Sequence, residues 1–239
     1  DDITAHHTPS YDDTEKTHGL LKVDFGVSVN GFTADSAISF DLESSEENKR
    51  LIFAAEQALN KATDLVKKHK NNTKINEIGK EIEDSIIANK LQAIINLSGH
   101  SIEKYDLHAG ITIPNTDNGD KEELGKGLFA IEPFVTLSSG NGKVYDSKPG
   151  EIYHLIARKP IRDPNSRIIL DYIEKEYKTL PFCTRWLVKK FGTKALITLR
   201  QLTSIGALHN YEELVETSHK KVAQAEHTFI IDDEITIIN

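Results

Sequence analysis

The chain has 239 residues, 38% of them hydrophobic, and a formal net charge of −8. This apolar content is enough for the core of one domain of ordinary size, or of one domain with an insertion. The acidic balance argues against strong nucleic-acid binding, which needs a basic face. No stretch approaches the roughly 18 consecutive apolar residues that a membrane span needs.

The cysteine and methionine content adds two expectations. Cys183 is the only cysteine, which excludes a disulfide framework and favours a reducing compartment, so the cytoplasm is the expected location. Methionine is absent, and the chain opens on Asp1-Asp2-Ile3-Thr4, which reads as the middle of a strand. We therefore expect the natural protein to begin before this segment.

The first part of the chain predicts strands followed by two helices. A strand is expected at residues 3–7 and a hairpin at residues 20–40, because Asn30-Gly31 between two β-rich runs is a strong turn signal. A capping-box pattern at residues 44–47 opens a helix, and apolar residues keep helical spacing as far as Val66. A second amphipathic helix follows, with one apolar face formed by Ile75, Ile78, Ile82 and Ile86.

The rest of the chain predicts strands, then helices, then strands again. Strands are expected at residues 92–97, 107–113, 127–137, 224–231 and 235–238, and helices at residues 167–178, 185–191, 193–205 and 212–220. This order is typical of an α+β fold interrupted by a helical insertion.

The hairpin places two carboxylates close together. A two-residue turn at Asn30-Gly31 pairs Gly26 with Asp35, and Asp24 then lies on the same face, diagonally across from Asp35. Such diagonal neighbours are about 7–8 Å apart at the backbone. Two carboxylates on an apolar hairpin repel each other and resist burial, so a metal ion between them is the simplest interpretation. The alternative is that one aspartate is a solvent-facing turn residue.

Four further residues could join this pair. His100 follows a predicted strand and a glycine, and His108 is expected inside an apolar strand. Each histidine alone is more often structural than a ligand. Glu132 and Glu226 each stand in an apolar run, where an unpaired buried carboxylate is costly.

Together, the carboxylates and one histidine offer five oxygen and nitrogen ligands. Carboxylate-rich sites with one histidine suit a pair of divalent ions such as Mn, Co, Fe or Zn. Two adjacent ions can lower the pKa of a bridging water and hold a substrate carbonyl. The pattern therefore predicts hydrolysis of a carbonyl bond.

At this point the motifs resemble a known family over nearly the whole chain. The motifs are Asp24 and Asp35 eleven residues apart, Asn96-Leu-Ser-Gly-His100, Leu-His108-Ala-Gly, Ala-Ile-Glu132-Pro-Phe and Ala-Gln-Ala-Glu226-His-Thr. In order and spacing they resemble the type II (archaeal or eukaryotic-like) methionine aminopeptidases. The resemblance implies the pita-bread fold, a pseudo-two-fold α+β arrangement, and metal-dependent removal of the initiator methionine from new proteins.

The resemblance also implies roles for individual residues. Asp24, Asp35, His100, Glu132 and Glu226 fall on the metal ligands. Asp35 and Glu226 would bridge two ions, and Glu132 would also shuttle a proton. The remaining implied roles are contact with the substrate carbonyl for His108, contact with the scissile amide for His6, and lining of the substrate pocket for Tyr211.

The 93 residues between Glu132 and Glu226 exceed what one β connection needs. Their helical middle resembles the lid-like insertion that marks type II members. The expected domains are thus a pita-bread catalytic domain at residues 1–156, with N-terminal elements missing, a helical insertion at residues 157–216, and final catalytic-domain strands at residues 217–239.

The implied cofactors are two divalent ions, Co, Mn, Fe or Zn. The implied partner is the N-terminal methionine of nascent polypeptides, with the ribosome as a candidate docking partner. We expect a monomer, with no membrane and no specific nucleic-acid partner. Two alternatives are another pita-bread metallopeptidase, such as a prolidase or aminopeptidase P, and an inactive binding protein of the same fold.

Family members carry further helices and a strand before the segment that begins here. We therefore expect exposed apolar surface, and hypothesise that the chain is a fragment or one part of a split protein.

Overall fold

The computed structural model describes residues 1–238, and the chain forms two compact units. Unit 1 comprises residues 1–4, 17–145 and those from 215 onward, and unit 2 comprises residues 5–16 and 146–214. Each unit has a hydrophobic core of its own. Within residues 1–238, no helix has both the length and the apolar character that crossing a membrane requires.

Unit 1 combines antiparallel sheets with two long helices, α1 (Glu46–His69) and α2 (Ile75–Ala88). A five-stranded sheet has the order β14-β13-β7-β5-β6, a three-stranded sheet the order β12-β8-β4, and β2 and β3 form a hairpin. The strands are β2 (Leu20–Val29), β3 (Phe32–Asp41), β4 (Leu91–Ala93), β5 (Ser98–Ile102), β6 (Thr112–Pro114), β7 (Gly127–Ile131), β8 (Phe134–Leu137), β12 (Val222–Gln224), β13 (His227–Ile231) and β14 (Ile235–Ile237).

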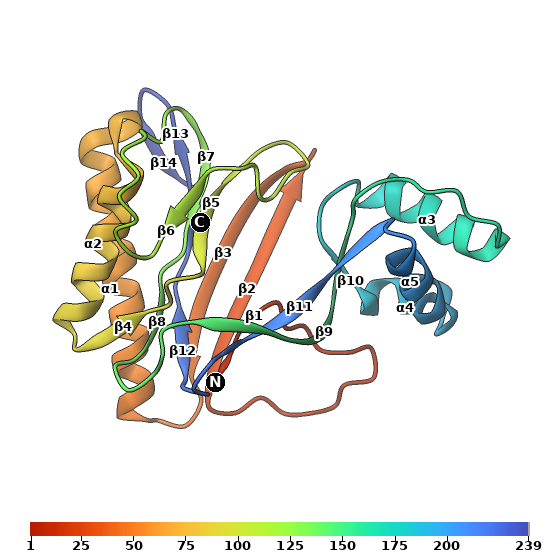
Figure 1. Cartoon of the computed structure of the whole chain (residues 1–239), viewed down its shortest axis with the longest axis horizontal. Coiled ribbons are helices and arrows are strands. Elements are labelled where there is room, and N and C mark those ends of the chain that lie inside the picture. The colour runs from red at the N-terminus through yellow and green to blue at the C-terminus, as the bar shows by residue number, and fades with distance from the viewer. Residues whose placement is uncertain (239) are drawn as a thin grey trace. The chain divides into compact units, whose positions relative to one another are not determined.

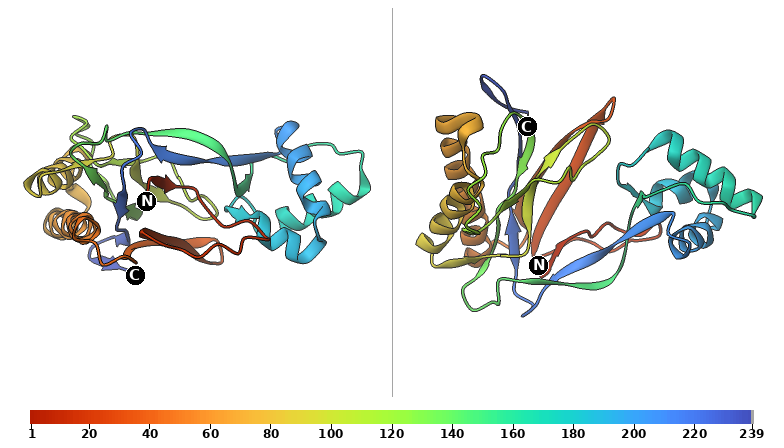
Figure 2. Two further views of the ribbon diagram at one scale, coloured as in Figure 1. Left: turned by 90° about the horizontal axis from the view of Figure 1, so that it is seen from below. Right: turned by 45° about the horizontal axis from the view of Figure 1, so that its top comes forward.

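The helices of unit 1 lie side by side against its strands, and the views in Figures 1 and 2 agree on this. Helix α1 contacts β8 and β12, whereas α2 contacts β4 and β6. The buried stripe of α1 is rich in alanine, which allows a close approach to its neighbours. The four isoleucines that predicted the apolar face of α2 are all buried, so this prediction is confirmed.

The hairpin forms as predicted. Asn30 and Gly31 have φ angles of 54° and 89°, and this left-handed backbone is the one that an Asn-Gly turn provides. Val29 pairs with Phe32, and Gly26 pairs with Asp35. One face of the hairpin is apolar, and its exposed large side chains are Val23, Phe25, Val27, Val29, Phe32, Ile38 and Phe40.

The N-terminal cap of α1 differs from the predicted capping box. Ser45, not Ser44, is the cap residue, and its hydroxyl accepts a hydrogen bond from the backbone N–H of Asn48 at 3.4 Å. The reciprocal half of the box is missing, because Asn48 occupies the glutamate position and its side chain donates to Asp41 instead.

Unit 2 contains the helices α3 (Pro164–Glu176), α4 (Thr184–Phe191) and α5 (Lys194–Ser204). A four-stranded sheet has the order β1-β11-β9-β10, in which the strands are β1 (Ile3–Ala5), β9 (Val144–Leu155), β10 (Phe182–Cys183) and β11 (Leu208–Glu216). The three helices fall inside the predicted insertion, while unit 2 also includes residues 5–16 and 146–156. The predicted domain boundaries stay a prediction.

Two parts of this region were predicted wrongly. Residues 212–220 were expected to be helical, but β11 extends to Glu216. Glu213 and Glu216 are buried there and have partners: His7 bonds Glu213, and backbone N–H groups bond Glu216. Tertiary contacts therefore override the helical propensity of this segment. Strand β9, which contains Pro149 and Gly150, was not predicted.

Candidate metal centre

The predicted ligands of unit 1 are brought together by contacts of β3 with β13 and with the segment that joins β12 to β13. Thr228 Oγ1 accepts a hydrogen bond from the backbone N–H of Asp35 and donates one to its carbonyl oxygen, both at 2.7 Å. Two residues earlier, the N–H of Glu226 donates to the carbonyl oxygen of Ala37 at 3.0 Å. These bonds fix the position of Asp35 relative to Glu226.

Two of the predicted ligands stand where strands are interrupted. Residues 127–137 were expected to be one strand, but Glu132 and Pro133 separate β7 from β8. Similarly, Ala225 and Glu226 separate β12 from β13. The ladders that pair β7 with β13 and β8 with β12 stop at these points, and Glu226 forms a single bridge with Ala37 instead. The two glutamates therefore stand outside the regular alternation of those ladders.

His100 approaches the same place from β5. Contrary to the prediction, it lies within a strand and does not follow one. A Cβ atom on the preceding Gly99 would lie 2.3 Å from the carbonyl oxygen of Ala130, so only glycine permits this close packing of β5 on β7. Nε2 of His100 lies 3.6 Å from Oε1 of Glu132 and 3.9 Å from Oδ2 of Asp35.

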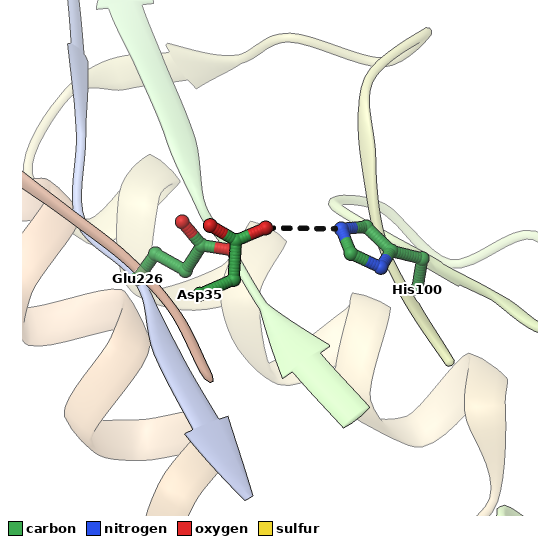
Figure 3. Close-up of side chains that lie close together, drawn as sticks. All are labelled: Asp35, His100 and Glu226. Carbon is green, nitrogen blue, oxygen red and sulfur yellow. Dashed lines mark ion pairs between the residues drawn. The ribbon is translucent and has the colours of Figure 1, made fainter. Parts of the chain in front are cut away.

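The five predicted ligands form two groups that share one residue. Ligand atoms of Asp35, His100 and Glu226 all lie within 4.8 Å of one another, and so do those of Asp24, Glu132 and Glu226. Figure 3 shows Asp35 between His100 and Glu226, with the imidazole directed at the carboxylate. Asp35, His100 and Glu226 are buried, whereas Asp24 is exposed.

The carboxylates raise one another's pKa. Burial, followed by repulsion from Asp24, raises the pKa of Asp35 to about 7. Burial and repulsion from the neighbouring carboxylates also raise the pKa of Glu132 and of Glu226. Oε2 of Glu226 is buried and has no hydrogen-bond partner among residues 1–238. Such a group is stable in its ionised form only with a cation close by.

The histidine is suited to the same cation. Burial, helped by the neighbouring His108, lowers the pKa of His100 to about 4. The imidazole is therefore neutral at physiological pH, which is the form that binds a metal. An oxygen-rich donor set with one imidazole fits a divalent ion such as Mn, Co, Fe or Zn.

His108 lies beside this cluster, although its predicted strand is wrong. The strand expected at residues 107–113 begins only at Thr112, and His108 sits in a bend. Its ring packs edge-on against that of His100, with the ring centroids 4.5 Å apart.

His6 and Tyr211 belong to unit 2, where their ring centroids are 5.0 Å apart. Nδ1 of His6 lies 3.1 Å from the carbonyl oxygen of Glu212, to which it donates in the tautomer protonated at that nitrogen. The backbone of His6 has a φ of 63°, a left-handed conformation that is uncommon for residues other than glycine.

Sequence reasoning missed one side chain of this cluster, Gln224. Its amide donates hydrogen bonds to Asp24 and to Glu132. The residue was visible in the motif Ala-Gln-Ala-Glu226, but a glutamine in an apolar run carries no charge to suggest a site.

The model of metallopeptidase family M24 matches residues 2–231. The chain belongs to this family. It is 40% identical to a methionine aminopeptidase of Pyrococcus abyssi, over 99% of this chain and 80% of that protein. The predicted resemblance to methionine aminopeptidases is therefore confirmed, and so is the hydrolase class.

Solved structures show the same fold. A thermophilic Arx1 superposes with a TM-score of 0.80 at 17% identity, over 97% of this chain and 71% of that one. The methionine aminopeptidase of Thermotoga maritima gives a TM-score of 0.58 at 20% identity, over 92% of this chain and 64% of that one. The predicted pita-bread fold is confirmed by the family and by these structures. Membership of a metallopeptidase family also implies the use of a divalent metal.

Proposed function

We propose that this chain of the M24 family removes the N-terminal methionine of nascent proteins with two divalent ions, held by Asp24, Asp35, His100, Glu132 and Glu226. The observation that carries this proposal is the position of Glu226, whose carboxylate belongs to two overlapping groups of ligand atoms. A single shared carboxylate between two sets of donors is the arrangement expected of a dinuclear centre. The resemblance assigns a bridging role to Asp35 as well, although Asp35 belongs here to the histidine-containing group alone.

The chemistry follows from the residues at this site. When bound, two ions would lower the pKa of a water molecule and polarise the first peptide carbonyl of the substrate. Glu132 takes a proton from the attacking water and passes it to the leaving amine. His108, packed against His100, donates a hydrogen bond to the carbonyl oxygen as negative charge develops on it.

Two further contacts with the substrate are implied by the resemblance alone. The resemblance assigns His6 to the scissile amide and Tyr211 to the pocket for the methionine side chain. Their edge-to-face ring contact orients the imidazole, and the carbonyl of Glu212 fixes which nitrogen carries its proton. A ring held in this way is prepared for a single hydrogen-bonding role.

The test is methionine release from a Met-Ala-Ser peptide with Mn or Co added, beside an Asp35→Asn variant. Release that both a chelator and the variant abolish is the expected result. Release from an X-Pro dipeptide but not from Met-Ala-Ser would replace the proposal with the prolidase alternative. Stoichiometric metal binding without hydrolysis of either peptide would instead support the inactive binding protein.

Several finer features remain predictions: the identity of the ions among Mn, Co, Fe and Zn, a monomeric state, docking on ribosomes and a cytoplasmic location. Metal analysis of the purified protein and its sedimentation behaviour would test the first two.

A further inference from the structure

The amide of Gln224 contacts two predicted ligands at once. Its Nε2 lies 3.0 Å from Oδ2 of Asp24 and 3.2 Å from Oε2 of Glu132. An ionised carboxylate can accept hydrogen bonds but cannot donate them, so the NH2 group of the amide must face Asp24 and Glu132. This group has two N–H bonds, one for each carboxylate.

The residue is held rigidly. Gln224 is 1% exposed, and its backbone exchanges two hydrogen bonds with the hydroxyl of Ser39. The N–H donates to that hydroxyl at 2.9 Å, and the hydroxyl donates to the carbonyl oxygen at 2.7 Å. On the other side, Gln224 pairs with Phe134 in the β12–β8 ladder. A donor fixed on both sides determines where its acceptors lie.

Both partners of the amide belong to the Asp24–Glu132–Glu226 group. Neither is His100 or Asp35, which complete the other group with Glu226. We propose that Gln224 is a positioning residue that selectively strengthens binding of the ion held by Asp24, Glu132 and Glu226. This inference rests on the proposed dinuclear site, and it concerns the difference between the two ions.

The physical reason is the mutual repulsion of the two carboxylates. Without a donor between them, Asp24 and Glu132 would turn apart or take up a proton. Their oxygen atoms would then have to be brought together each time the ion binds. Hydrogen-bonded partners of metal ligands commonly change metal affinity by about 10–100-fold. A fixed neutral amide orients the ligands without adding a charge that would repel the ion.

The test is calorimetric titration of the chelator-stripped chain with MnCl2 or CoCl2, before and after Gln224→Met. Methionine keeps the length and apolar stem of glutamine but cannot donate. We expect one of the two dissociation constants to rise about 10–100-fold, while the other changes by less than about twofold. The matched control is Gln57→Met on α1, which removes the acceptor of a hydrogen bond from Asn89 and should leave both constants unchanged.

A double-variant cycle identifies the affected ion. Asp24→Asn should weaken the same binding step. In a chain that already carries Asp24→Asn, Gln224→Met should raise the dissociation constant by a smaller factor than it does in the unmodified chain, because the two residues act on one ion. Equal weakening of both steps by Gln224→Met would mean a general structural role and would overturn the inference. Two ions bound with unchanged constants in Gln224→Met would overturn it while leaving the proposed function intact. A single ion bound by the unmodified chain would overturn both.

Discussion

Asp35 should make the chelator-stripped chain less stable as the pH rises. Its pKa is raised from 3.8 to about 7 in the folded chain, so the folded state binds this proton more tightly than the unfolded state does. Protonated Asp35 therefore adds to the free energy of unfolding. This contribution is fully present below the pKa of Asp35 in the unfolded chain, and it is lost as the pH rises through about 7, the pKa in the folded chain. A shift of about three pKa units corresponds to about 4 kcal/mol in order of magnitude.

Other groups titrate in the same range, so the effect must be isolated by difference. The pKa of His100 is lowered to about 4, and its contribution has the opposite sign, because stability rises with pH until the unfolded pKa of 6.5 is passed. Asp35→Asn removes this carboxyl titration and can retain the acceptor for the N–H of Ser36. It also removes the repulsion by which Asp35 raises the pKa of Glu132 and of Glu226, so the difference reports the coupled carboxylates together. We expect the stability of Asp35→Asn relative to the unmodified chain to increase by about 4 kcal/mol between pH 4 and pH 8.

The assay is urea unfolding with chelator present, followed by circular dichroism. Trp186, the only tryptophan, lies in unit 2, so its fluorescence reports whether unit 2 unfolds together with unit 1. Saturating Mn should reverse the sign of the difference, because the ionised carboxylate then binds the ion. Parallel stability profiles for the two proteins from pH 4 to pH 8 would refute this account of Asp35.

Three further substitutions test single contacts that stabilise unit 1 or unit 2. Gly99→Ala should destabilise the chain by about 1–3 kcal/mol and weaken metal binding, because the added Cβ would lie 2.3 Å from the carbonyl oxygen of Ala130. Urea unfolding and a metal titration measure the two effects. If both curves match those of the unmodified chain, β5 and β7 can separate with little loss of stability. Ser45→Ala should cost about 1 kcal/mol through loss of the α1 cap, measured by urea unfolding, and no change would mean that solvent replaces the hydroxyl. Glu213→Gln should cost about 1–3 kcal/mol, because this buried carboxylate bonds His7 at 2.8 Å. The midpoint of urea unfolding measured by Trp186 fluorescence should fall, and an unchanged midpoint would mean that the neutral amide retains the bond to His7.

The parts of the fold that were predictable from the sequence are those governed by local chemistry. Asn30-Gly31 requires a left-handed turn, and the turn length then determines which residues pair across the hairpin. The α2 face follows from helical spacing alone. In contrast, β11 contains Glu213 and Glu216, whose burial depends on partners far away in the sequence. No local pattern could indicate those partners.

At the site, too, local sequence features were predictable and contacts between distant segments were not. Glu132 and Glu226 were conspicuous as charges in apolar runs, which is a local signal. Their position at strand interruptions, and the grouping of Glu226 with two sets of ligands, depend on pairing between distant strands. Gln224 gave no signal because its importance lies wholly in what it contacts.

The bonds that join β3 to residues 224–228 also determine when the centre can form during synthesis. Asp35 and Thr228 are 193 positions apart, and Ser39 and Gln224 are 185 apart. The ribosome must therefore make all of unit 2 before Glu226 reaches its place in unit 1. Both groups of ligands in unit 1 remain incomplete until Glu226, which lies between β12 and β13, has emerged. A nascent chain stalled before residue 222 would lack Glu226, the carboxylate on which both groups of ligands depend.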